Sequence, residues 1–102
     1  MPFVVYLAAF FAGAFLANSI PHLVKGICGD SFPTPFAKPP GKGLSSPTVN
    51  AAWGLLNLAL GYWLLHPGLV AYDHPVPIVL FALGFITLTM MCAVSFQRKH
   101  AA

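Results

Sequence analysis

Three long stretches of this sequence are mostly apolar and contain no charged side chain. They cover residues 3–20, 48–65 and 76–96. With a helical rise of about 1.5 Å per residue, each comes close to the roughly 30 Å of hydrocarbon in a bilayer. The pattern predicts an all-α integral membrane protein in which three transmembrane helices form a single domain over residues 1–102.

Composition supports the same class. The chain is 58% hydrophobic and 7% charged, whereas a soluble domain carries roughly 25% charged residues. No Lys or Arg precedes the first apolar stretch, so the basic segment that opens a signal peptide is missing. We therefore expect the first stretch to be a retained helix.

The basic residues predict an orientation. They lie between the first and second stretches or after the third, and the connector between the second and third has none: Lys25, Lys38, Lys42, Arg98 and Lys99. Basic loops stay in the cytoplasm, which predicts a multi-pass inner-membrane protein with its N-terminus outside and its C-terminus in the cytoplasm. We expect the five cations to meet lipid headgroups. The net charge of +3 is explained in this way, without nucleic acid.

The connector between the first two stretches is predicted to be an ordered loop. The first helix is expected to end near Ile20, where the apolar stretch stops, and Ser46 followed by Pro47 is typical of a helix N-terminus. The residues between them are rich in Gly and Pro but include four apolar side chains that a disordered linker would lack: Val24, Phe32, Phe36 and Leu44. We expect the loop to fold back on the cytoplasmic end of the bundle.

Each stretch also carries small or polar residues three and four positions apart, which places them on one helix face. Such faces let helices approach closely in lipid. The three predicted faces are Ala9, Gly13 and Ala17; Asn50, Gly54, Asn57 and Gly61; and Gly84, Thr87, Met91 and Ser95.

Asn57 lies in the middle of its stretch, where its amide needs a partner. Thr87 has a similar depth, so we expect a hydrogen bond between the two, or a polar lining that they share. No charged residue lies within a stretch, which argues against a proton-coupled exporter.

Polar residues also gather at the cytoplasmic end, where Asn18, His22 and Asn50 share one depth. Together with Asn57 and Thr87 they are the candidate polar core or ligand site. His22, Cys28 and Asp30 lie within nine residues and could supply a base, a nucleophile and a carboxylate. An ordinary interfacial histidine and an aspartate in a turn explain them better, so the sequence favours a role without catalysis.

No cofactor or metal is predicted. Cys28 and Cys92 are expected on the reducing side of the membrane, as thiols. His22, Cys28, Cys92 and His100 have none of the compact zinc spacings. His22 and His66 lie at opposite ends of their helices and cannot ligate one haem together. A metal held by the first set, or a haem with a single or shared histidine, stays open.

Three functions are compatible with these features. The first is a structural or accessory membrane component that forms a homo-oligomer or joins a larger membrane complex. The second is a small oligomeric transporter or channel lined by Asn57 and Thr87. The third is an enzyme or ligand-binding site at the cytoplasmic mouth, around His22 and Asn50.

Overall fold

The computed structural model describes residues 3–66 and 73–97, and these form three helices. They are α1 (Phe3–Ile27), α2 (Pro47–Leu64) and α3 (Pro75–Gln97), so the predicted all-α class is confirmed. By length and composition, α1 and α3 are candidate membrane spans, whereas α2 does not meet the same criterion.

The polar residues of α2 explain why it differs from the other two helices. Asn50 and Asn57 lower its average hydropathy, but both are buried, with 0% and 1% of their surfaces exposed. The exposed side of α2 carries leucines instead: Leu55, Leu56, Leu58 and Leu60. An average over the whole helix therefore hides an apolar outer face.

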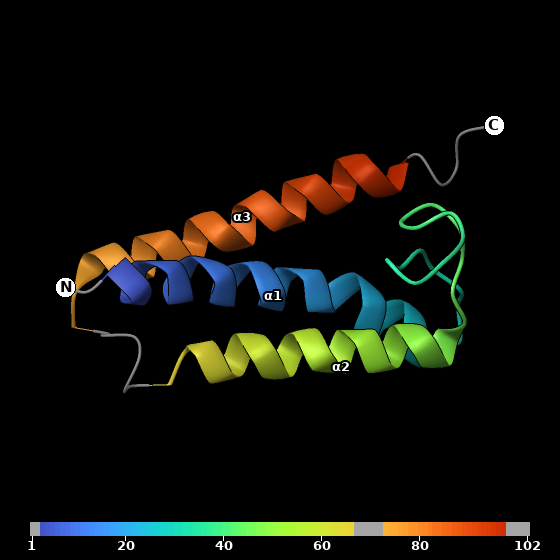
Figure 1. Ribbon diagram of the computed structural model, residues 1–102, viewed down its shortest axis with the longest axis horizontal. Helices are drawn as coiled ribbons and strands as arrows, with labels where there is room; N and C mark the ends of the chain where they lie inside the picture. The colour runs from blue at the N-terminus through green and yellow to red at the C-terminus, as the bar shows by residue number, and fades with distance from the viewer. Residues whose placement is uncertain (1–2, 67–72, 98–102) are drawn as a thin grey trace.

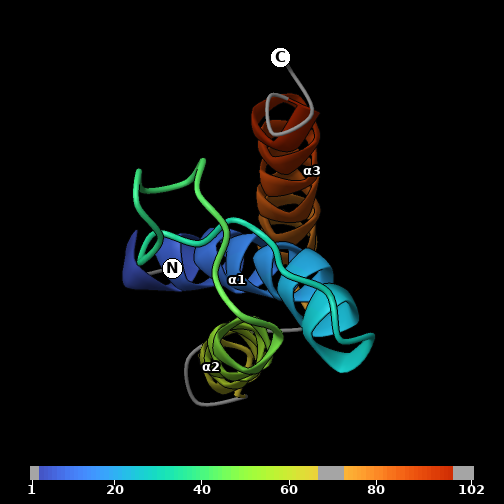
Figure 2. The ribbon, with the colours of Figure 1, turned by 90° about the vertical axis from the view of Figure 1, so that its right-hand side faces the viewer.

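α1 lies between the other two helices and packs against both (Figures 1 and 2). Within the described residues, α2 and α3 make no contact with each other. Two positions on the α1–α3 contact require glycine because backbone faces backbone there. A Cβ at Gly84 would lie 1.9 Å from the Phe10 carbonyl oxygen, and one at Gly13 would lie 2.1 Å from that of Phe81.

Two of the three predicted packing faces are buried within the chain, and most of the third is not. The small residues of α1 and the four positions on α2 are buried. Of the four predicted positions on α3, Gly84 is buried, while Thr87, Met91 and Ser95 are exposed. α3 approaches α1 closely near Gly84 and then diverges from it toward the C-terminal end (Figure 1).

The first helix is longer than predicted, because α1 continues through Pro21 to Ile27. A proline removes one helical N–H, and inside a bundle neighbouring groups can compensate for that loss. The helix ends at Ile27, just before Gly29, whose φ of 76° is left-handed. There the Asp30 N–H donates to the Lys25 carbonyl and the Gly29 N–H donates to that of Gly26, which is a Schellman cap.

The predicted start of α2 is confirmed. Ser46 is the N-cap, its hydroxyl accepts from the Val49 N–H at 3.2 Å, and Pro47 follows in the first turn. Most of the second connector, and Arg98, Lys99 and His100 after α3, lie outside the described residues.

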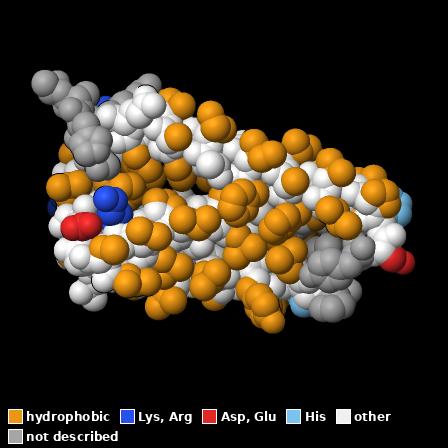
Figure 3. Space-filling model, turned by 180° about the vertical axis from the view of Figure 1, so that it is seen from behind, with side chains coloured by type: hydrophobic (Ala, Val, Ile, Leu, Met, Phe, Trp, Pro, Cys, Tyr) orange, Lys and Arg blue, Asp and Glu red, His pale blue; other side chains and the backbone are white. Residues whose placement is uncertain are grey.

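The surface reflects this arrangement. Hydrophobic side chains cover the length of the bundle on the face seen in Figure 3, and charged side chains appear toward its two ends. Most large apolar residues of α2 and α3 are exposed, as expected for helices whose solvent is lipid.

Candidate functional site

The connector between α1 and α2 forms a folded loop over one end of the bundle. Phe32 and Ser45 pair as an isolated β-bridge, with N–H to carbonyl distances of 3.2 and 3.0 Å. The Gly41 N–H donates to the Thr34 carbonyl at 2.9 Å, and the Thr34 and Ser45 hydroxyls are hydrogen-bonded to each other. The prediction of a folded loop is thus confirmed.

The predicted apolar contacts of that loop are confirmed for two of the four side chains. Phe32 is buried against His22 and Phe96, and Phe36, although more than half exposed, packs edge-to-face on Trp53 at 5.0 Å. Leu44 is more than half exposed, and Val24 belongs to α1. The other buried loop residues are Pro33, Thr34 and Ala37.

Asn50 fastens the loop to both helices. Its Nδ2 donates to the carbonyl oxygens of Phe32, Ser45 and Ser46 at 3.0, 3.2 and 3.0 Å. Its Oδ1 lies 2.8 Å from His22 Nδ1. One fully buried amide therefore joins α1, α2 and both ends of the loop.

These contacts fix the tautomer of His22. The amide cannot be flipped, since its oxygen would then face three carbonyl oxygens. Oδ1 only accepts, so the proton of a neutral imidazole must be on Nδ1. Nε2 then presents a lone pair. Within residues 3–66 and 73–97, no hydrogen bond to this second nitrogen is seen.

Aromatic rings surround His22, which is only 2% exposed. Phe32, Phe96 and Trp53 all pack edge-to-face against its ring, with centroid distances of 5.5, 6.0 and 6.5 Å. These rings come from the loop, α3 and α2. His22 is therefore held in place from every element that reaches this end of the bundle.

A cavity of about 120 Å³ lies beside this cluster. Its lining comes from α1, the loop, α2 and α3: Asn18, His22, Pro33, Thr34, Pro35, Gly41, Trp53 and Phe96. The space is sufficient for several water molecules or a ligand of a few heavy atoms. No charged side chain is among its walls in the described part of the chain.

Trp53 adds a donor among the residues that line the cavity. Its indole Nε1 is buried and, within the described part of the chain, has no hydrogen-bond partner. A buried donor without a partner costs about 1–3 kcal/mol, and such groups call for an explanation. Two residues of the cavity wall, Trp53 and His22, thus carry an unpartnered donor and an unpartnered acceptor.

The asparagine in the middle of α2 does not bond as predicted. Asn57 Oδ1 accepts from Asn18 Nδ2 at 3.0 Å, and Asn57 Nδ2 donates to the Trp53 carbonyl. Thr87 is exposed and donates to the Leu83 carbonyl of its own helix. Because α2 packs on α1 and not on α3, Asn57 and Thr87 do not line a common path within one chain.

A weaker contact extends this polar chain to α3. The Cys92 thiol donates to Asn18 Oδ1 at 3.6 Å. Asn18, Asn57 and Cys92 thus connect all three helices at one depth, next to the cavity that Asn18 also lines.

The other predicted site residues lie apart from this cluster. Cys28 and Asp30 are exposed beyond the end of α1, and neither is hydrogen-bonded to His22. The structure therefore does not bring the three candidate catalytic groups together. Lys25, Lys38 and Lys42 are on the loop side of the bundle.

Metal ligands do not cluster either. Over residues 3–66 and 73–97, no three His, Cys, Asp or Glu side chains lie close enough to hold an ion. Both cysteines are free. His100 is outside the described residues.

Sequence reasoning did not select Trp53, Thr34 or Phe96. For Trp53 a signal exists, because it is three positions after Asn50 and four before Asn57, on the same helix face. Thr34 and Phe96 reach the site through the loop and the path of α3, which no local pattern encodes.

Comparison with protein-family models, curated proteins and solved structures finds no match to this chain.

Proposed function

We propose that this chain is a multi-pass protein of the inner membrane that binds a small polar ligand in the cavity beside His22. The observation that carries the proposal is the pair of unused hydrogen-bonding groups there: the buried Trp53 indole N–H and His22 Nε2. A ligand with one donor and one acceptor would satisfy both groups.

The membrane part of the proposal has its own support. The two asparagines of α2 are paired inside the bundle and its outer face is apolar, so all three helices are suited to lipid. α1 contacts both other helices, which supports its retention in the mature protein. The basic residues keep the loop and the C-terminus in the cytoplasm.

The proposal is tested with 1-butanol, whose hydroxyl both donates and accepts. In a Trp63→Phe variant in nanodiscs, ¹⁵N-labelled tryptophan gives a single indole N–H resonance, that of Trp53. We expect 1-butanol to move this resonance downfield and to saturate, because a new hydrogen bond deshields the proton.

The matched control is the Trp53→Phe variant, which reports Trp63, 61% exposed at the other end of α2. A Trp53 response that is absent, or linear and equal to that of Trp63, would contradict binding in the cavity.

The second candidate is an accessory component that associates with another membrane protein or with a second copy. It is favoured by Thr87, Met91 and Ser95, which form a face on α3 that no helix of this chain covers. Native mass measurement in nanodiscs tests it: a monomer with no bound protein would contradict this role.

A further inference from the structure

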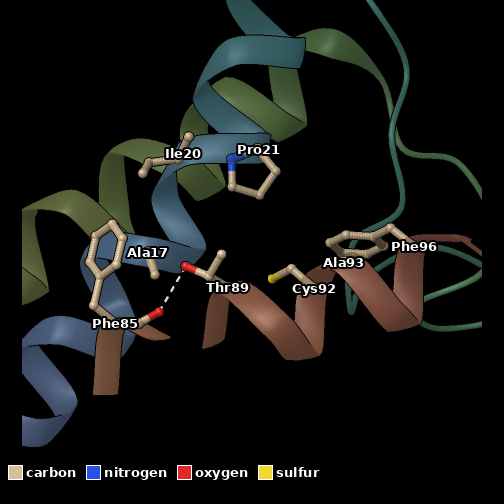
Figure 4. A pocket seen from close by; sticks show the side chains of 8 residues that line it. All are labelled: Ala17, Ile20, Pro21, Phe85, Thr89, Cys92, Ala93 and Phe96. Atoms are coloured by element: carbon tan, nitrogen blue, oxygen red, sulfur yellow. Dashed lines mark hydrogen bonds between the residues drawn. The ribbon is translucent and has the colours of Figure 1, made fainter. Parts of the chain in front are cut away.

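An apolar groove lies directly beside the polar cavity. It has a volume of about 390 Å³ and runs between α1 and α3 where the two helices diverge: Ala17, Ile20, Pro21, Phe85, Thr89, Cys92, Ala93 and Phe96 line it. Figure 4 shows Thr89, Cys92 and Phe96 extending from α3 toward Pro21 and Ala17 on α1. The hydroxyl of Thr89 is bonded to the Phe85 carbonyl, so the groove presents almost no free polar group.

The groove and the cavity adjoin each other at two places. The Phe96 ring is a wall of both spaces, and it packs on His22 and Phe32 at centroid distances of 6.0 and 4.6 Å. Cys92, in the groove, is hydrogen-bonded to Asn18, in the cavity. A polar pocket and an apolar groove therefore share one boundary.

The dimensions of the groove match half of a membrane. From Phe85 to Phe96, α3 rises about 16 Å, close to the roughly 15 Å of hydrocarbon in one leaflet. The cavity lies at the end of this path nearest the lysine-bearing loop. A lipid in the inner leaflet would match this arrangement, with its head at the cavity and its chain along the groove.

We propose that the ligand is a neutral, single-chain lipid with a hydroxyl head. The hydroxyl donates to His22 Nε2 and accepts from the Trp53 indole N–H, and the hydrocarbon chain lies in the groove between α1 and α3. This inference rests on the proposed function, because it takes the cavity as the place where the head binds.

The head must be uncharged for the chain to bind in this position. Over residues 3–66 and 73–97, the cavity walls carry amide, hydroxyl, imidazole and indole groups but no cation, so a phosphate or carboxylate would lose its water without gaining an opposite charge from them. A hydroxyl brings the one donor and one acceptor that the two free groups need.

The chain is expected to add only moderate affinity. Lipid is as apolar as the groove, so the chain gains packing contacts but no hydrophobic transfer. At equal mole fraction in the membrane, we expect 1-hexadecanol to half-saturate the Trp53 resonance at about one fifth of the level that 1-butanol needs.

The experiment uses the Trp63→Phe protein in phosphatidylcholine nanodiscs with four probes: 1-butanol, 1-hexadecanol, hexadecane and hexadecanoate at pH 8. Hexadecane should leave the indole shift unchanged, and hexadecanoate should bind more weakly than the alcohol. Ala93→Trp fills the groove from an exposed position and should remove the fivefold advantage of 1-hexadecanol while leaving 1-butanol unaffected. Ala93→Leu is a milder second variant, and Ala82→Trp, exposed outside the groove, is the matched control.

Each contrary result has a distinct meaning. If 1-butanol binds and 1-hexadecanol binds no better, with or without Ala93→Trp, the lipid inference is overturned and the proposed function stands. Tighter binding of hexadecanoate would overturn the neutral head. A dimer that Ala93→Trp dissociates would assign the groove to a second copy instead. If neither alcohol shifts the resonance, the proposed function itself fails.

Discussion

Replacing Asn50 by alanine tests whether one buried amide holds the loop on the bundle. The substitution removes three donated hydrogen bonds and the acceptor of His22. The carbonyls of Phe32, Ser45 and Ser46 each keep a backbone donor, from Ser45, Phe32 and residue 50 respectively. The His22 Nδ1–H keeps no partner in a site that is 2% exposed.

These losses determine how far the free energy of loop opening should change. An unsatisfied buried donor costs about 1–3 kcal/mol, and the weakened carbonyl contacts add about 1 kcal/mol. Opening the loop exposes His22 to water and relieves this cost. The equilibrium for loop opening should therefore shift by about 3 kcal/mol, which is roughly a 100-fold change.

Amide hydrogen exchange in nanodiscs measures that shift. The N–H groups of Phe32, Gly41 and Ser45, all bonded within the loop, should lose about 100-fold in protection. Amides in the middle of α1 should keep theirs. Asn57→Ala is the matched control, because it removes a buried amide that does not touch the loop. If the loop amides of Asn50→Ala keep exchange protection within threefold of that in the unmodified protein, Asn50 does not hold the loop on the bundle.

Three further substitutions test other parts of the structure. Gly84→Ala should destabilise the α1–α3 contact by about 1–3 kcal/mol because its Cβ would meet the Phe10 carbonyl. Gly29→Ala meets no atom within 4 Å and should cost only about 1 kcal/mol of left-handed backbone strain. Unfolding in mixed micelles compares the two variants, and equal losses of stability would contradict the packing. Asn57→Leu should destabilise the protein by about 0.6–2 kcal/mol, and Thr87→Val should leave its stability almost unchanged, both measured by the same unfolding assay. The reverse order would support the predicted hydrogen bond between Asn57 and Thr87. In a Cys92→Ser background, Cys28, which is exposed, should react with an impermeant maleimide only after the cytoplasmic side is opened. Labelling of Cys28 in intact cells would show the opposite orientation.

The sequence predicted the features that depend on local chemistry. The start of α2 follows from Ser46 and Pro47 alone, and the buried faces of α1 and α2 follow from residue spacing. Depth along a helix also follows from the sequence, which predicts that His22 and Asn50 lie at one level. His22 and Asn50 do meet.

Which helices are neighbours is not a local property. Asn57 could be assigned a depth but not a partner: its partner is Asn18, which the sequence pattern groups with the cytoplasmic end, and not Thr87. Only the central position of α1 decides between them. The same reason explains the third face, where Thr87, Met91 and Ser95 have suitable spacing but no helix opposite. The end of α1 shows the remaining limit: the apolar stretch stops at Ile20, whereas packing carries the helix on to Ile27.

The separation of α2 from α3 has a consequence for the energetics of the whole bundle. Within the described residues, each of these helices packs against α1 and the two do not pack against each other. Substitutions at sites without shared partners have nearly additive effects on stability. Gly61 on α2 faces Leu16 and Gly84 on α3 faces Phe10, so variants at these two glycines should sum in the double mutant. Coupling is expected instead where both outer helices pack on the same residues of α1. Trp53 and Phe96 meet in this way on His22 beside the cavity, and Leu64 and Leu80 meet on Ala8 and Ala9 at the opposite end of the bundle.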